Sequence, residues 1–319
     1  MLRFLARRIL FGALILWIIS VVVFVLFFVA PGDPARLIAG RLATPETMAL
    51  VRHRLGLDEP ILVQYARFVG RLLHGDLGYS FYSSSPVNSL LFDRLPVSAS
   101  LALGGAVIWL VMGVTIGVAS ATHPRSAIDR GATVFVLTGL SMPTFLLGLI
   151  LLFVLFFRLH LIGIDWFPGG GYVPFTENPA TWAQHMILPW LTLALVNAAV
   201  YSRLTRGSLL DTLGEDYIRT ARSKGLRERR VVYRHGLRSA LTPIVTQAGI
   251  DIGTLLGGVI VTETVFGLPG LGQLAVQSVT NQDRPVIIGV VMLASAFIVV
   301  ANIIVDFMYA VLDPRVRLA

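Results

Sequence analysis

The chain has 319 residues, of which 55% are hydrophobic and only 14% are charged, and its mean hydropathy is +0.77. Soluble domains carry about 25% charged residues, so this composition excludes an ordinary soluble enzyme, a disordered chain and a coiled coil, and it indicates a membrane protein. The net charge is +8, and the lack of cysteine excludes disulfides, thiolate metal ligands and a thiol nucleophile.

Several charge-poor stretches are long enough to cross a bilayer as helices, because about 20 apolar residues span its core. We therefore predict an all-α membrane protein with six transmembrane helices. The first stretch follows Arg3, Arg7 and Arg8 as a secretory signal would, but it is too long and lacks a small-residue cleavage site, so we interpret it as a retained helix. The predicted spans are residues 9–30, 97–122, 131–157, 178–202, 239–262 and 285–305.

The cations orient these spans, since cytoplasmic loops carry an excess of Lys and Arg. Seventeen of the 26 cations lie in the two terminal segments and in the loops 121–130 and 203–238. The short loops of the other set hold only Arg158 and Arg284. We therefore expect the N and C termini to be cytoplasmic.

This orientation divides the chain into parts. Between the first two spans lies an extracytoplasmic insert, in which residues 45–53 and 61–73 have the pattern of short amphipathic helices. The predicted organisation is a tail and first helix (1–30), the insert (31–96), and a five-helix core (97–319) with a cytoplasmic loop (203–238).

Motifs for catalysis are missing from the sequence. The only lysine, Lys224, is followed by Gly225, so no nucleotide-binding phosphate loop can be built. There is also no H-E-x-x-H and no G-x-S-x-G. The glycine-rich run 267–272 follows a membrane helix and is interpreted as a tight extracytoplasmic turn. We expect no enzyme activity, no metal site and no nucleic-acid partner in this chain.

Residues 214–225 have the signals of a short helix outside the bilayer. Glu215 and Asp216 open it, Arg222 and Lys224 close it, and Gly225 follows, so that charges complement the helix dipole and glycine ends the helix.

We expect Tyr217, Ile218 and Ala221 to be exposed among these charges. A small apolar face ringed by charge suits docking into a groove on another protein. The alternative is an ordinary positively charged cytoplasmic loop.

The loop 203–238 resembles the "EAA" loop of permease subunits of binding-protein-dependent ABC importers. The family pattern E-A-A-x-x-x-G maps onto Arg219, Thr220, Ala221 and Gly225, so its glutamate and first alanine are absent here. The segment from Asp216 to Gly225 is closer to the dipeptide, oligopeptide and nickel branch of the family. Because residue 219 is an arginine, the resemblance implies an acidic partner group for it on the ATPase.

Other segments resemble the same branch, and together they cover essentially the whole chain. They are Pro31-Gly-Asp-Pro34, Leu55-Gly-Leu-Asp-Glu-Pro60, Gly75-Asp-Leu-Gly-Tyr-Ser80, Glu263-Thr-Val-Phe-Gly-Leu-Pro-Gly-Leu-Gly272 and Leu312-Asp-Pro-Arg315.

The resemblance implies a type I ABC importer permease fold and a multi-pass place in the plasma (inner) membrane of a prokaryote. It also implies three kinds of partner, beside membrane lipid: a second homologous permease, two cytoplasmic ATPases that bind ATP and Mg, and an extracytoplasmic binding protein. This chain itself would hold no cofactor. The residues that it implies for ATPase coupling are Asp216, Tyr217, Arg219, Thr220, Ala221 and Gly225.

Asp251 lies midway along the fifth predicted span. A carboxylate at the bilayer centre costs roughly 2.5–3.5 kcal/mol on insertion scales, so it should face protein or water. It is either a residue of the translocation pathway or a hydrogen-bonded interhelical carboxylate. Gly249, Gly253 and Gly257 recur every four residues in the same span, and Gly113 and Gly117 do so in the second span, which predicts close packing either within this subunit or against the partner permease. Gly249 and Gly253 lie on the face opposite Asp251.

The function predicted is that of a permease subunit that imports oligopeptides or dipeptides, driven by ATP hydrolysis in partner subunits. A permease for nickel or another small solute is the alternative within the family. A secondary transporter or channel would require internal repeats and several intramembrane charges. An intramembrane hydrolase would require a catalytic pair that the sequence does not offer.

Overall fold

The computed structural model describes residues 2–29, 44–80, 82–257 and 259–312. Within these ranges the chain is mostly helical, and its only strands are β1 (Tyr79–Ser80) and β2 (Ser85–Pro86), which form a short antiparallel pair. Two segments that carry the family resemblance, Pro31–Pro34 and 313–315, lie outside the described residues.

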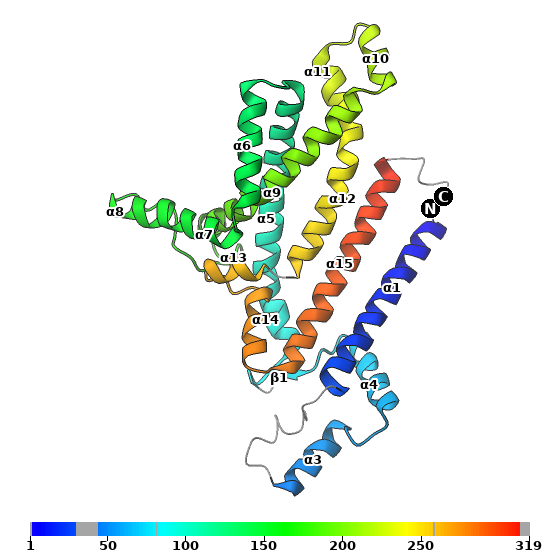
Figure 1. Ribbon diagram of the computed structural model, residues 1–319. Coiled ribbons are helices and arrows are strands. Elements are labelled where there is room, and N and C mark those ends of the chain that lie inside the picture. Colours follow the sequence, from blue (N-terminus) through cyan, green and yellow to red (C-terminus); the bar gives the residue numbers. More distant parts are fainter. Residues whose placement is uncertain (1, 30–43, 81, 258, 313–319) are drawn as a thin grey trace.

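Long helices form an elongated bundle, with α10 at one end and α3 at the other (Figure 1). The bundle contains α1 (Leu2–Phe24), which continues into the π-helix η1 (Val25–Val29), and α5 (Val87–Thr122), α6 (Ala127–Ser141), α9 (Pro179–Leu213), α12 (Leu237–Leu256) and α15 (Arg284–Leu312).

The most extensive helix–helix packing in the bundle is between α5 and α9, where Trp109 and Tyr201 are fully buried. Gly113 makes this approach feasible: a Cβ placed there would stand 2.5 Å from the Cβ of Tyr201. The glycines of the second predicted span therefore pack within this chain.

Among the described residues, five helices are long and apolar enough to cross a membrane. This agrees with a helical membrane protein, although it is one helix fewer than predicted. The helix α12 is not among the five, and polar groups in its middle make it less apolar. The five candidates are Ala6–Phe28, Val87–Thr122, Thr144–Leu161, Pro179–Leu213 and Arg284–Phe307.

The third predicted span, 131–157, is not a single helix, and this prediction was wrong. The helix α6 ends at Ser141, and Met142 takes an extended conformation (φ −95°, ψ 120°), as residues before proline do. The chain then leaves the bundle sideways (Figure 1). This sideways segment consists of α7 (Thr144–Leu151), the π-helix η2 (Leu152–Arg158) and α8 (Leu159–Leu161).

Two helix ends differ from the predicted spans. The helix α5 begins at Val87, before the second predicted span and within the predicted insert. The fifth predicted span ends early: α12 stops at Leu256, with Gly257 as its cap, and α13 (Ile260–Val265) is a separate helix. The connection after α13 leads to α14 (Leu271–Thr280) and α15.

Both short helices predicted in the insert are present, as α3 (Pro45–Leu55) and α4 (Ile61–Leu73). The apolar face of α4 packs on the end of α1, where Phe68 lies 5.8 Å from Phe24 and from Phe28 between ring centroids. The hydroxyls of Tyr65 and Ser20 are 2.9 Å apart. The insert therefore leans on the first membrane helix through an aromatic cluster.

Candidate functional site

The short helix predicted within residues 214–225 is present as α10 (Asp216–Ser223), at the far end of α9 (Figure 1). It begins after Glu215, which is extended, with Asp216 in its first turn and Arg222 in its last. Beyond it, Gly225 has φ +73°, in the left-handed region that favours glycine, and its N–H donates to the Arg222 carbonyl at 2.9 Å. The charged residues and the glycine that predicted the ends of this helix from the sequence therefore do lie at its ends.

The apolar face of α10 does not point outward, which corrects the expected exposure of Ile218 and Ala221. Ile218 is fully buried and Ala221 is 8% exposed, and both pack against Val231, at the start of the π-helix η3 (Val231–Gly236). The reason is physical: an eight-residue helix is not stable by itself in water. It is held here by burying its apolar side against its own chain.

The outward face of α10 is polar. Asp216 and Arg219 are strongly exposed and form an i, i+3 ion pair at 2.6 Å, a surface pair of small energetic value. Thr220 is exposed beside them. Tyr217 is 45% exposed, and its hydroxyl donates to Ser239 Oγ at 3.1 Å. Four of the six predicted coupling residues thus reach this surface, whereas Ala221 faces inward and Gly225 closes the helix.

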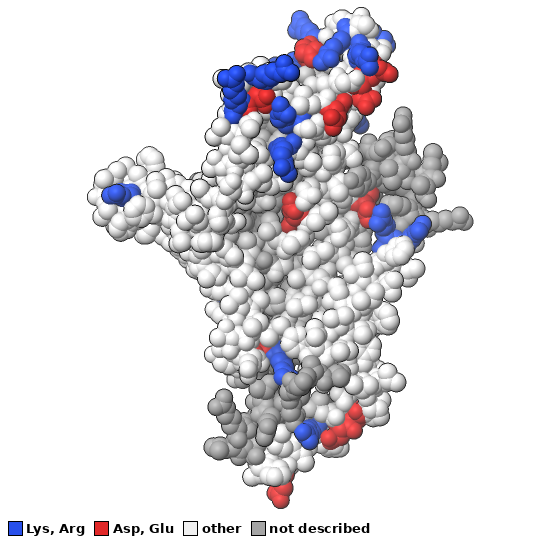
Figure 2. Space-filling view, in the orientation of Figure 1, with Lys and Arg blue, Asp and Glu red and all other residues white. Residues whose placement is uncertain are grey.

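The surroundings of α10 are strongly charged. Figure 2 shows cations and acids gathered at this end of the molecule, over α10 and α11 (Glu228–Arg230), whereas the broad middle of the visible face is nearly free of charge. The Arg222 side chain donates to both carboxylate oxygens of Glu228, at 2.7 and 3.1 Å, and this hydrogen bonding lowers the pKa of Glu228. This pair ties the end of α10 to the helix that follows.

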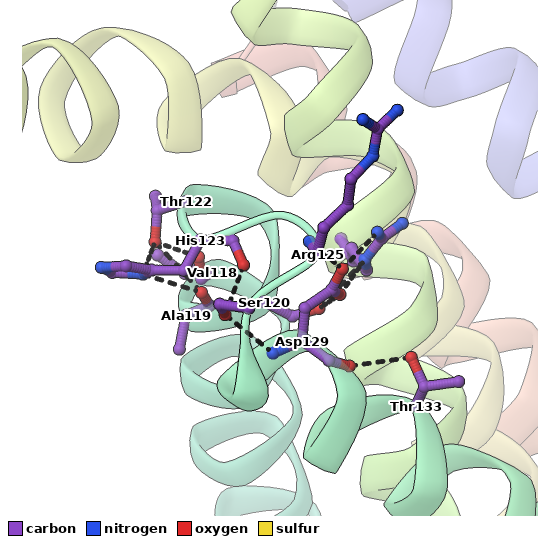
Figure 3. Close-up of polar contacts among 10 residues, drawn as sticks. Val118, Ala119, Ser120, Thr122, His123, Arg125, Asp129 and Thr133 are labelled. Atoms are coloured by element: carbon purple, nitrogen blue, oxygen red, sulfur yellow. Dashed lines mark hydrogen bonds and ion pairs between the residues drawn. The ribbon is translucent and has the colours of Figure 1, made fainter.

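A second polar cluster, which we call the Asp129 cluster, consists of Asp129, Ser120, Arg206 and the backbone of Arg125 (Figure 3). Oδ1 of Asp129 accepts from Ser120 Oγ at 2.5 Å and from Arg206 Nε at 2.8 Å. Oδ2 accepts from Arg206 Nη2 at 3.1 Å and from the Arg125 N–H at 2.9 Å. The Arg125 side chain points away from the cluster in Figure 3.

The Asp129 cluster joins the end of α5, the start of α6 and the middle of the charged part of α9. Asp129 is only 7% exposed, and the hydrogen bond from Arg206, aided by those from Ser120 and the Arg125 N–H, lowers its pKa well below the ordinary value. It is therefore ionised at neutral pH, with every donor directed at the charged form.

Sequence reasoning missed the Asp129 cluster. The only local signal is Ser126, whose Oγ accepts from the Asp129 N–H and caps α6. The partner Arg206 lies 77 residues further along the chain, too far for any local pattern to reveal.

Asp251 lies between α12 and α9, where it meets neutral donors. The Tyr201 hydroxyl donates to its Oδ2 at 2.7 Å, and Gln247 Nε2 donates to its Oδ1 at 2.9 Å. On the opposite side of α12, Gly249 and Gly253 face Val305 and Ala301 of α15, so these glycines also pack within this chain. Both partners of Asp251 were missed by sequence reasoning.

The glycine-rich turn between α13 and α14 is held by a fully buried carboxylate, Glu263. It accepts from Ser98 Oγ at 2.7 Å and from the Gln273 N–H at 2.8 Å. Gly270 presses on it so closely that an added Cβ would stand 2.3 Å from the carboxyl carbon. Among the described residues, no group of three or more His, Cys, Asp or Glu side chains could hold a metal ion.

Comparisons with known proteins define the class of this fold and site. A family described as "Binding-protein-dependent transport system inner membrane component" matches residues 113–318, and the N-terminal unit of the same systems matches residues 1–102. The chain therefore belongs to the family of inner-membrane permease components of binding-protein-dependent ABC importers, and its place is the plasma membrane, which it crosses several times.

The relatives place it within the peptide branch of that family. It is 41% identical to a putative peptide transport system permease of Brucella abortus, over 95% of each chain. It is 42% identical to the glutathione transport system permease GsiC of Salmonella paratyphi A, over 99% of each chain. Among solved structures, a chain of the MetNI methionine ABC transporter matches 70% of this chain and 96% of its own length, with a TM-score of 0.53 and 22% identity, which supports the fold alone.

Proposed function

We propose that this chain is the permease subunit of an ABC importer that carries peptides, from dipeptides to longer ones, across the plasma membrane. Its relatives named for peptide and glutathione transport support the substrate class. The observation that carries the mechanism is α10: a short helix outside the bundle, held by its buried face, with its polar face free. A permease for nickel or another small solute is the alternative.

In this proposal the chain crosses the membrane six times, with both termini in the cytoplasm. The bundle helices α6 and α12 are the spans that apolar length alone does not identify. The helix α6 is short, and α12 carries Asp251 and Gln247, which form a hydrogen-bonded pair in its middle. ATP and Mg bind only to two partner ATPases, and this chain holds no cofactor. A second, similar permease completes the pathway, and a binding protein delivers the substrate on the extracytoplasmic side.

Movement passes from the ATPases to the permease through α10. Asp216, Tyr217, Arg219 and Thr220 form the face offered to the ATPase, with Arg219 suited to an acidic group there. Ala221 and Gly225 support this face without belonging to it. Ala221 packs α10 onto η3, and Gly225 ends the helix.

A cysteine crosslinking experiment tests this face directly, because the chain contains no cysteine of its own. A Thr220→Cys variant in the assembled transporter is expected to crosslink to an ATPase with a short bifunctional reagent. Ala221→Cys is the matched control, because its side chain is buried and should not react. Absence of any ATPase crosslink from positions 216, 219 and 220 would contradict the proposal.

Reconstitution tests the function as a whole. Proteoliposomes that contain the permease pair, the ATPases and the binding protein are expected to take up di- to oligopeptides or glutathione only with ATP. Uptake of nickel but of no peptide would favour the alternative. Uptake by this chain alone, driven by an ion gradient, would overturn the importer assignment.

Asp251 has two proposed roles, the interhelical one and the pathway one. The hydrogen bonds from Tyr201 and Gln247 support the interhelical role, since each carboxylate oxygen already has a donor. An Asp251→Asn variant separates the two roles. Reduced uptake by a normally assembled, thermally stable complex indicates the pathway, whereas a lower melting temperature with intact uptake per complex indicates the interhelical role.

A further inference from the structure

Given the proposed function, movement of α10 has to reach the transmembrane helices through the contacts that α10 makes with its own chain. The helix α10 is fixed to its own chain on two sides. Ile218 and Ala221 pack on Val231 of η3, and α9 ends at Leu213, just before α10 begins. Ser208 Oγ of α9 donates to the Ala240 carbonyl of α12 at 3.1 Å. A displacement of α10 therefore carries the end of α9 and the start of α12 with it.

The Asp129 cluster is the polar link from this unit to the α5–α6 hairpin. Arg206 lies seven residues before the end of α9, about two helical turns from it. Its guanidinium donates from Nε and Nη2 to the two carboxylate oxygens of Asp129, and the Nε–H is shared with Ser120 Oγ at 3.0 Å. The fork of Arg206 thus joins α9 to α6 and α5 at once, at the end of the bundle where α10 lies (Figure 1).

The geometry is that of a rigid joint. Two parallel hydrogen bonds from a planar guanidinium fix an angle as well as a distance, which a lysine does not do. The acceptor is also held from its own side, because the Arg125 N–H and the Ser126 cap fix Asp129 at the start of α6. The close packing of Gly113 on Tyr201 already holds α5 against α9, and the joint at Asp129 adds a polar link from both helices to α6.

We propose that Asp129 and Arg206 are positioning residues for transport: they make the α5–α6 hairpin move as one body with α9 and the coupling helix. Neither residue touches the substrate or ATP. Their effect is on how much of the α10 movement reaches the transmembrane helices, in keeping with rigid elements that carry coupling between distant sites.

Distance measurements on the complete transporter test this directly. Spin labels are placed at Ile128 of α6 and Ser223 of α10, both exposed, in a chain that has no other cysteine. The wild-type distance distribution is expected to be narrow and equal with and without ATP. In Asp129→Asn it is expected to broaden and to differ between the two states. A wild-type distance that changes with ATP, or an unchanged distribution in the variant, would overturn the proposal.

The functional readout is the amount of substrate imported per ATP hydrolysed, in proteoliposomes that contain equal amounts of assembled complex. Asp129→Asn and Arg206→Gln are expected to lower this ratio at least fivefold while ATP hydrolysis continues, and Arg206→Lys is expected to fall between them and wild type. The matched control is Glu59→Gln, which removes the exposed Glu59–Arg67 pair at the other end of the molecule and should leave the ratio unchanged.

The outcomes distinguish the possible roles. An unchanged ratio in variants of lower thermal stability would show that the Asp129 cluster only stabilises the fold, and the positioning proposal would fall. A wild-type complex that shows no ATP-dependent uptake would instead defeat the proposed function, and the ratio could not then be defined.

Discussion

Removal of the Ile218 side chain is expected to release the helix α10 while the rest of the permease stays folded. Ile218 is fully buried beneath α10, in a small cluster with Ala221 and Val231. An Ile218→Ala change deletes three carbon atoms, worth about 0.8 kcal/mol each in transfer free energy. A cavity adds to this cost, and large-to-Ala changes in cores reach about 2–5 kcal/mol. Because this cluster lies near the surface and can relax, we expect about 2–3 kcal/mol.

The loss lowers the free energy that keeps α10 closed on η3, because the helix has too few residues to persist once it is detached. At 1.4 kcal/mol per factor of ten, the open fraction should rise roughly 30- to 150-fold. Amide hydrogen exchange of the segment 214–226 measures this rise directly, in detergent or nanodiscs.

The matched control for this experiment is Thr220→Ala, on the exposed side of the same helix. This variant should change the free energy of opening of α10, as measured by exchange, by less than about 0.5 kcal/mol. Exchange in α5 and α9 should stay the same in both variants. If Ile218→Ala left the protection of 216–223 at the wild-type level, the cluster with Val231 would not be what holds the helix, and the account of its stability would be wrong.

Three further perturbations have defined outcomes. Gly249→Ala should destabilise the fold by about 1–3 kcal/mol, because the added Cβ would stand 1.7 Å from Val305 Cγ2. Adding Val305→Ala to this variant should restore the melting temperature. A Gly249→Ala variant as stable as wild type would contradict the close contact of α12 with α15. Glu263→Gln should lower the free energy of unfolding by about 1–3 kcal/mol and raise amide exchange in residues 263–273. The reason is that the Val259 N–H and the Gln273 N–H each donate to one carboxylate oxygen, and in the variant one of these N–H groups would face an NH₂ group. Unaltered exchange in this segment would contradict the structural role of Glu263. The pKa of Asp129 is lower in the fold than in the unfolded chain, so its stabilising effect is complete above the unfolded value of about 3.9 and is lost as the pH falls from there toward the folded value. The difference in melting temperature between wild type and Asp129→Asn should therefore stay constant from pH 7 to pH 5 and shrink below about pH 4, and a difference that persists undiminished at about pH 3 would refute the ionised cluster.

The parts of the fold that follow from local chemistry could be predicted from the sequence. Charge-poor runs locate α1, α5, α9 and α15. The acids, cations and glycine around α10 place its ends, and the apolar spacing of α4 predicts the face that packs on Phe24 and Phe28. In each of these cases the sequence signal lies within one helix. The composition of that helix indicates whether it lies in the membrane or outside it, and which of its faces is packed.

The break in the third predicted span shows where such reasoning stops. Pro143 separates α6 from α7, yet Pro189 lies inside α9 and Pro243 inside α12 without ending either helix. A proline therefore marks a position where a helix can end, and tertiary packing decides whether it does. The same limit explains the missed partners at the site: Asp129 with Arg206, and Asp251 with Tyr201, join residues 77 and 50 positions apart.

The exposure of α10 was mistaken for a related reason. Ile218 and Ala221 have the spacing of a docking face, and they do dock, but onto η3 of the same chain. Periodicity identifies which side of a helix is apolar, and it does not identify what covers that side. The surface left for a partner is the polar one, with Asp216, Arg219 and Thr220.

The dependence of α10 on Val231 also sets an order of events during synthesis. Residues 216–223 leave the ribosome before residue 231, so the nascent chain lacks the surface on which this helix rests until the start of α12 has been made. A truncated or stalled product that ends before η3 consequently lacks the residues that bury Ile218 and Ala221. The polar surface of α10 is therefore ordered only in a chain that has been made as far as the start of α12.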